Sequence, residues 1–239
     1  MDTQLARALQ LPLSPYVSRR GTTLPNVFRT SASVTLGNLT LPISDAIALD
    51  TTSAFKGEDR HVDGTLAYGL FKDRLLQIDY AKGVLRTSAP LVASWACAAH
   101  CGQIKLITFG KSGPPIVTGY PFEINGKPVV AQIDTAFEGT MVLYPNAVDA
   151  LHLHSLEKRA APRFFPFSDG GVTMLAKATE SLGFADQPLG SDRPTVYLTT
   201  KGVHLPDALF DATVGNELFK GAVLTLDFHD MIMSVELDR

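Results

Sequence analysis

The chain has 239 residues, enough for one large domain or two small ones with a buried core. It carries 21 Lys and Arg against 24 Asp and Glu, a net charge of -3, which excludes a surface that recruits nucleic acid or anionic lipid by positive charge. Hydrophobic residues make up 45% and charged residues 19%, as in folded globular proteins, and no apolar run reaches the roughly 18 residues of a membrane span.

The pattern along the chain predicts a mostly β protein with two short helices. Apolar spacing near 3.6 predicts helices over residues 2–11 and 145–153. Alternating apolar residues around turn residues predict three hairpins. Their turns lie at 37–38, 125–128 and 169–171.

The cysteines and the N-terminus say little about the compartment. Cys97 and Cys101 fit a linker disulfide or two free thiols better than zinc, because two further ligands are not evident nearby. Residues 1–4 show no signal-peptide pattern. We assign no compartment, although an exported or periplasmic location is compatible with the cysteines.

The strongest feature is internal similarity. Residues 63–80 match residues 211–228 at a constant offset of 148, with seven of 18 positions identical. Residues 8–11 match 150–153 more weakly, at an offset of 142. We therefore predict two copies of one β-rich unit: an incomplete N-terminal lobe at 1–88, a linker at 89–104 and a C-terminal lobe at 105–239.

The residue pattern that points to chemistry lies in the second copy. An apolar strand at 129–133 runs directly into Asp134, which small residues follow. A carboxylate at the end of a buried strand is held rigidly beside backbone N–H groups. An isolated Asp after a strand more often only starts a turn, so Asp134 gains its interest from context.

Residues 134–143 resemble the Asp-Thr-Gly-Phe-x-Gly-x-Leu-x-Leu motif of bacterial and archaeal retropepsin-like proteins, and more broadly the aspartic peptidases of the retropepsin and pepsin type. The resemblance continues in Thr213, Val214 and Gly215, which fit the apolar-apolar-Gly strand of that family, and in a closing strand at 223–227. It implies an all-β fold of two lobes related by a pseudo-twofold axis, the first lobe being incomplete.

The resemblance also implies roles for individual residues. Asp134 would be one of two carboxylates that share a proton and activate a water molecule. Thr135 would tie two active turns together, and Thr213, Val214 and Gly215 would brace the Asp134 turn from behind. Ala136 and Gly139 would shape the turn, and no metal or cofactor is implied.

Two departures affect activity. Ala136 stands where the family has Gly, which costs roughly 1 kcal/mol if the position requires a positive φ or close packing. The offsets place the counterpart of Asp134 before Met1, and Asp2 fits a helix N-cap better than a catalytic role. We therefore expect an N-terminally truncated chain whose first Asp-Thr-Gly lies upstream.

Other candidates are weaker. His152 and His154 are two residues apart on the predicted helix and point apart, which disfavours a metal pair. Residues 169–171 fit a hairpin turn better than an anion cradle, since no helix or P-loop lysine follows. The resemblance implies that this turn is the tip of a flap over the cleft.

The sequence thus predicts an aspartic endopeptidase-like protein, or a fragment of one, that cleaves a peptide or unfolded protein in a cleft between two lobes. The alternative is a catalytically inactive homologue that binds peptides or a protein partner. We favour a monomer over a homodimer in which each chain donates Asp134.

Overall fold

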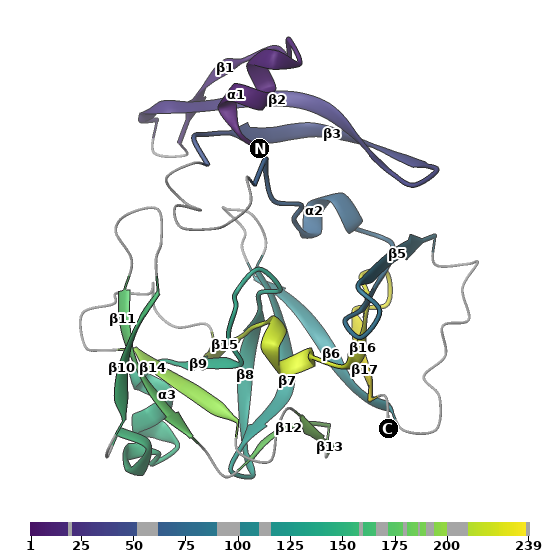
Figure 1. Cartoon of the computed structure of the whole chain (residues 1–239). Coiled ribbons are helices and arrows are strands. Elements are labelled where there is room, and N and C mark those ends of the chain that lie inside the picture. The colour runs from purple at the N-terminus through teal and green to yellow at the C-terminus, as the bar shows by residue number, and fades with distance from the viewer. Residues whose placement is uncertain are drawn as a thin grey trace. The chain divides into compact units, whose positions relative to one another are not determined.

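The computed structural model describes the chain except for several short stretches. The described residues are 1–18, 21–51, 62–89, 101–109, 116–157, 160–165, 172–178, 181–185, 187–189, 194–199 and 210–237. The predicted linker lies largely outside them, as do Cys97 and the predicted turn at 169–171. The chain forms two compact units, each described separately (Figure 1). Unit 1 comprises Met1–Leu70 and Phe164–Val172, and unit 2 comprises Phe71–Arg163 and Thr173–Arg239.

Strands dominate the described residues, which confirms the predicted all-β class. The helical segments are α1 (Thr3–Ala8), α2 (Tyr68–Phe71), α3 (Pro145–Ala150) and the 3-10 helices η2 (His154–Glu157) and η3 (Asn216–Phe219). The strands are β1 (Ser14–Val17), β2 (Thr23–Leu36), β3 (Leu39–Ala48), β4 (Leu75–Asp79), β5 (Val84–Ser88), β6 (Cys101–Phe109), β7 (Ile116–Ile124), β8 (Lys127–Ile133), β9 (Met141–Leu143), β10 (Ala161–Phe165), β11 (Val172–Ala178), β12 (Leu182–Phe184), β13 (Gln187–Leu189), β14 (Thr195–Thr199), β15 (Ala212–Val214), β16 (Ala222–Asp227) and β17 (Ile232–Leu237). Among the described residues, no helix has the length and apolar character needed to cross a membrane.

Two of the predicted hairpins are confirmed. β2 and β3 meet at a two-residue turn after Leu36, and β7 and β8 meet at Asn125 and Gly126. Both predicted helices exist but are shorter than predicted, since α1 and α3 span six residues each. Turn chemistry was thus a better guide than apolar spacing for fixing element ends.

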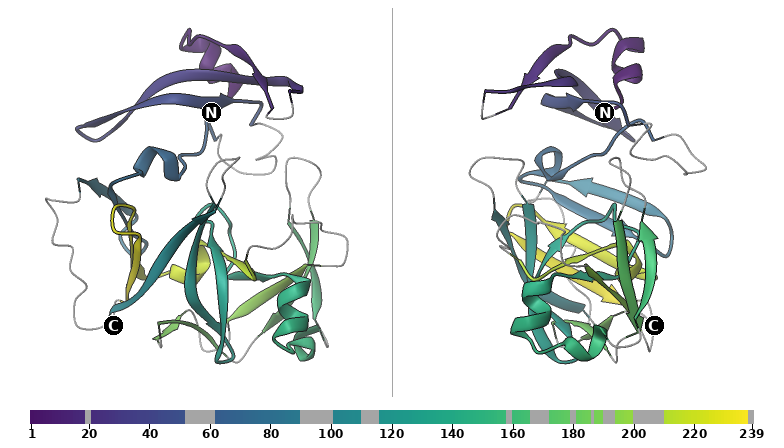
Figure 2. Two further views of the ribbon diagram at one scale, coloured as in Figure 1. Left: turned by 180° about the vertical axis from the view of Figure 1, so that it is seen from behind. Right: turned by 90° about the vertical axis from the view of Figure 1, so that its left-hand side faces the viewer.

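Unit 1 is built around a small sheet in the order β1-β2-β3. Figure 2 shows β2 and β3 as a long two-stranded ribbon. α1 precedes this sheet, and its N-cap is Asp2, as predicted. The Asp2 carboxylate is fully buried and accepts hydrogen bonds from the backbone N–H groups of Gln4 and Leu5 and from both the N–H and the hydroxyl of Thr51. These bonds fasten the start of the helix to the chain that leaves β3.

Unit 2 contains the larger sheet and most of the buried apolar side chains. Its strands follow the order β10-β11-β14-β9-β15-β8-β7-β6-β17-β16-β4-β5, with β12 and β13 attached through β7. The largest fully buried side chains all belong to unit 2 and come mainly from its strands: Tyr197, Phe122, Phe184, Phe219, Ile124, Met141, Leu143, Leu182, Leu218, Leu224, Met233 and Val129.

β4 and β16 meet in a pairing with local twofold symmetry. Gln77 pairs with Thr225, the residue 148 positions further along, and its side-chain amide donates to the Thr225 hydroxyl at 3.2 Å. The N–H of Tyr80 donates to the carbonyl of Ala222 at 3.0 Å. The N–H of Phe228 donates to the carbonyl of Arg74 at 2.9 Å. These two bonds are equivalent, because Phe228 lies 148 positions after Tyr80 and Ala222 lies 148 positions after Arg74.

This pairing also explains where the units divide. The predicted boundary between lobes follows the sequence repeat, whereas the compact units divide at Leu70 and Phe71. β4 and β5 belong to the first repeat but extend the sheet of unit 2 through β16.

We predict that the contribution of Asp2 to stability is lost in acid. Its hydrogen bonds, chiefly from the backbone N–H of Thr51, lower the pKa of Asp2 to about 2. A carboxyl whose folded pKa is depressed stabilises the fold above its unfolded pKa of roughly 4, and the effect fades as pH falls towards 2. Asp2→Ala should therefore cost about 1–2 kcal/mol at neutral pH and little at pH ~2.

Urea unfolding and amide exchange at Gln4 and Thr51 over this pH range would measure the effect. Asp45→Ala, which removes an exposed carboxylate of the same unit, is the matched control. An Asp2→Ala deficit that is equally large at both ends of the range would contradict the assignment.

Candidate functional site

The Asp134 turn is held by three strands of unit 2. β15 runs between β8 and β9, parallel to the first and antiparallel to the second (Figure 1). β8 leads into the Asp134 turn, and β9 follows the turn from Met141. β15 therefore lies between the two strands that this turn connects. The N–H of Asp134 donates to the carbonyl of Val214 at 3.0 Å. The turn is therefore fixed to the end of β15.

Asp134 itself is half-buried, and its carboxylate takes part in the turn. The N–H of Ala136 donates to Asp134 Oδ1 at 3.1 Å, and the N–H of Phe137 donates to the Asp134 carbonyl at 3.1 Å. Thr135 and Ala136 are exposed. The carboxylate thus retains access to solvent while its backbone is held by hydrogen bonds.

Ala136 fits its position without backbone strain. Its φ is not among the positive values found in the described chain, and its side chain is exposed. The two conditions that would make a Cβ costly here are therefore absent at this residue.

Gly215 is closely packed against the turn from behind. A Cβ on Gly215 would lie 2.4 Å from the carbonyl oxygens of both Phe137 and Gly139. The N–H groups of Gly215, Asn216 and Glu217 donate to the carbonyls of Thr140, Phe137 and Gly139, at 2.9, 3.0 and 3.2 Å. This close approach lets consecutive N–H groups satisfy the turn's carbonyls, which a side chain at Gly215 would prevent.

Gly139 and Phe137 complete the packing beneath the turn. A Cβ on Gly139 would lie 2.3 Å from the Phe137 ring and 3.0 Å from the ring of Tyr197. Phe137 meets Tyr197 edge-on, with ring centroids 6.1 Å apart. Phe137 thus fills the space under its own turn.

Thr213 and Thr135 each take part in a hydrogen bond with another residue of unit 2. The Thr213 hydroxyl is buried and lies 2.6 Å from the hydroxyl of Tyr144. Thr135 contributes its carbonyl, which accepts from the side-chain amide of Asn216 at 3.4 Å. The tie between two active turns that was predicted for Thr135 remains a prediction.

Tyr144 and Asp211 support the site, and sequence reasoning did not assign them to it. The N–H of Tyr144 donates to the carbonyl of Asp211 at 3.1 Å, and Asp211 Oδ2 accepts from the N–H of Val130 at 2.9 Å. Burial raises the pKa of Tyr144, the bond to Thr213 lowers it, and the charge of Asp134 raises it. The sequence feature that could have drawn attention to Asp211 is its identity with Asp63 in the internal repeat.

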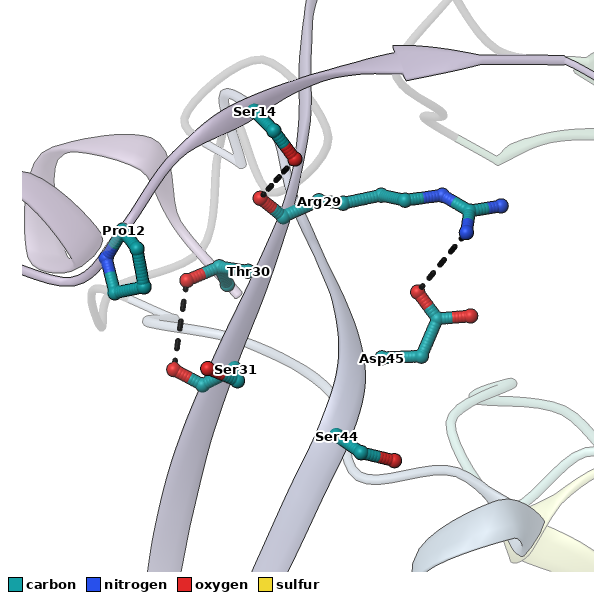
Figure 3. Close-up of a pocket in the computed structure, with 7 residues that line it drawn as sticks. All are labelled: Pro12, Ser14, Arg29, Thr30, Ser31, Ser44 and Asp45. Atoms are coloured by element: carbon teal, nitrogen blue, oxygen red, sulfur yellow. Dashed lines mark hydrogen bonds and ion pairs between the residues drawn. The ribbon is translucent and has the colours of Figure 1, made fainter.

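The remaining candidates are the histidines near α3, Cys101 and a pocket in unit 1. His154 contacts the exposed Asp149 at 3.6 Å, and no cluster of His, Cys, Asp or Glu among the described residues is suited to a metal ion. Cys101 is disulfide-bonded. Unit 1 carries an open pocket of about 480 Å³, where Arg29 faces Asp45 at 3.7 Å (Figure 3). Four of its seven lining residues carry a hydroxyl group, and these residues form no pair of nucleophile and base.

Comparison with known proteins gives distant likenesses to solved structures. No family model and no curated protein matches the chain. A retropepsin-like aspartic protease from Rickettsia conorii is 14% identical with a TM-score of 0.38, covering 58% of this chain and 92% of that one. An aspartic proteinase from Irpex lacteus is 9% identical with a TM-score of 0.46, covering 90% and 80%. Basic 7S globulin from soybean is 12% identical with a TM-score of 0.42, covering 95% and 71%. Both groups named in the sequence resemblance are thus among the matches.

We predict that Gly215→Ala destabilises unit 2 by about 2–4 kcal/mol, because the added methyl group must displace two backbone carbonyls. Gly69→Ala is the matched control, since a Cβ there meets nothing within 4 Å. Urea unfolding followed by circular dichroism would measure both. Equal stability of the two variants would show that the close approach is not required.

We also predict that the buried hydroxyl pair is coupled. Tyr144→Phe leaves the Thr213 hydroxyl without this partner and should cost about 1–2 kcal/mol. Adding Thr213→Val to Tyr144→Phe should then cost less than Thr213→Val does alone. A double-mutant cycle measures the coupling energy, and a value of zero would contradict a direct bond.

Proposed function

We propose that this chain is an aspartic endopeptidase-like protein that contributes Asp134 to a pair of carboxylates hydrolysing peptide bonds. The observation that carries the proposal is the cradle of the Asp134 turn: an accessible carboxylate on a turn whose carbonyls are held by the N–H groups after β15. Such rigid support suits a group that must keep its geometry through a reaction.

The chemistry needs two carboxylates in different protonation states. When they lie close together, they share one proton, because both cannot ionise at short range. The ionised carboxylate takes a proton from water, whose oxygen attacks the carbonyl carbon of the peptide, while the protonated partner donates to the carbonyl oxygen. Proton transfer to the nitrogen then lets the amine leave and the new carboxylic acid form. Asp134 fits either member of the pair.

The second carboxylate is proposed to come from a copy of the same unit. Internal duplication is supported by the twofold pairing of β4 with β16 and by residue pairs 148 apart that make equivalent bonds. The bounds of α1 and α3 differ by 142 at both ends, which supports placing the counterpart of Asp134 before Met1. We propose that the 239 residues are a fragment of a two-lobed enzyme, its lobes being 1–88 and 105–239 with a linker at 89–104.

One observation favours the alternative of an inactive peptide-binding protein. Asp2 is buried as a helix cap with its oxygens occupied, so this aspartate of unit 1 is not poised for catalysis. A chain with Asp134 alone could still bind an extended peptide, as a monomer.

The activity test uses a denatured protein substrate over about pH 3–7, with a pepstatin-type inhibitor. We expect little or no cleavage by the 239 residues. A longer form that includes the upstream coding sequence should cleave the substrate, and Asp134→Asn should slow it by roughly 100-fold or more, because a general base is lost.

Asp149→Asn, which removes an exposed carboxylate of α3, is the matched control and should leave cleavage unchanged. Cleavage unaffected by Asp134→Asn would refute the role of Asp134. Peptide binding without cleavage in the longer form would favour the inactive alternative.

A further inference from the structure

The segment 63–67 of unit 1 is more exposed than its counterpart in unit 2. Leu66 is 42% exposed, whereas Val214, 148 positions later, is fully buried as part of β15. Residues 63–67 are all exposed, whereas 212–215 are all buried. β15 owes its burial to β8 and β9 on its two sides.

The backbone around this segment repeats the geometry of unit 2. The N–H of Asp2 donates to the carbonyl of Asp63 at 2.5 Å, as that of Tyr144 does to Asp211. A Cβ on Gly64 would lie 2.9 Å from the Cα of Met1, so the backbones of these two residues are in contact. Their counterparts, Ala212 and Leu143, are paired residues of β15 and β9.

Met1 therefore occupies the position of the last residue of β9. In unit 2 the chain before Leu143 runs antiparallel along Thr213 and Val214. The corresponding path in unit 1 passes Thr65 and Leu66.

We propose that residues 64–66 are a docking site for a β-strand formed by polypeptide directly N-terminal to Met1. The strand pairs antiparallel with Thr65 and Leu66 and continues into Met1 and α1. Its side chains are apolar, as in β9, where Met141, Val142 and Leu143 are all buried. This inference rests on the duplication within the proposed function and is independent of peptide hydrolysis.

β5 provides a second, separate observation, within unit 2. β17, the counterpart of β5, has β16 on one side and β6 on the other. β5 ends the sheet among the described strands. Leu85 is 47% exposed, whereas its counterpart Met233 is fully buried. In unit 2 one continuous run, from β6 to β9, both borders β17 and flanks β15. β5 and the segment 64–66, each within its own unit, thus both have counterparts that are flanked by strands on two sides.

The test begins with the coding sequence upstream of Met1. We expect an open reading frame with an apolar strand pattern ending at Met1, and an in-frame stop directly upstream would overturn the proposal. The longer protein and the 239 residues are then compared by amide hydrogen exchange. Exchange at the Thr65 amide should be slower in the longer protein by roughly tenfold or more, because alternate N–H groups face an antiparallel neighbour and Thr65 corresponds to Thr213, which pairs with Val142 of β9. Unchanged exchange would overturn the proposal.

Leu66→Asp gives a second measurement that does not depend on activity. It should lower the melting temperature of the longer protein but leave that of the 239 residues nearly unchanged, because Leu66 is already exposed there. Leu9→Asp is the matched control, since Leu9 is 57% exposed, and its effect should be the same in both forms. Docking of the upstream strand would be contradicted if Leu66→Asp had an equal effect in both forms. It would also be contradicted if self-association of the 239 residues protected Thr65.

Protected amides in a longer protein that does not cleave peptides would support the docking site while refuting the proposed activity. Cleavage without such protection would do the reverse.

Discussion

The site depends on one close backbone approach, between Gly215 and the carbonyls of Phe137 and Gly139. At 2.4 Å from a hypothetical Cβ, this contact has no space for any residue with a side chain. It brings three consecutive N–H groups onto three carbonyls of the Asp134 turn, and those carbonyls would otherwise need water as their partner. The position of β15 between β8 and β9 makes this approach possible, so the topology of the sheet and the geometry of the turn require each other.

The surrounding packing preserves that approach. Phe137 turns back beneath its own loop and meets Tyr197, and Gly139 leaves space for both rings. Hydrogen bonds also join the end of β9 to the neighbouring strands. Tyr144 bonds to Asp211 through the backbone and to Thr213 through its hydroxyl, and the Asp211 carboxylate accepts from the N–H of Val130 in β8. The turn that carries the accessible carboxylate is therefore held both by packed aromatic rings and by hydrogen-bonded polar groups.

Sequence reasoning predicted those parts of the fold that depend on local chemistry. The turns at Gly37 and at Asn125–Gly126 and the capping role of Asp2 follow from the conformations and hydrogen bonds that these residue types favour. The brace by Gly215 could be anticipated only from a resemblance, because nothing local brings residue 215 to residue 137. The Tyr144–Thr213 bond was not predicted, since a tyrosine before a proline and a threonine in a strand have no spacing that links them. Helix lengths were overestimated because the apolar spacing continues past Gln10 and His152, whose positive φ ends each helix.

The twofold pairing of Gln77 with Thr225 has a consequence for dividing the molecule. Residues 1–88 contribute β4 and β5 to the sheet of unit 2, so a cut at the predicted linker would separate the hydrogen-bonded neighbours β4 and β16. A fragment starting at residue 105 would expose the full edge of β16, an unprotected template for intermolecular strand pairing and aggregation. The two halves of the sequence are therefore poor choices for separate expression. A fragment that is to remain in solution should keep β4 and β16 together.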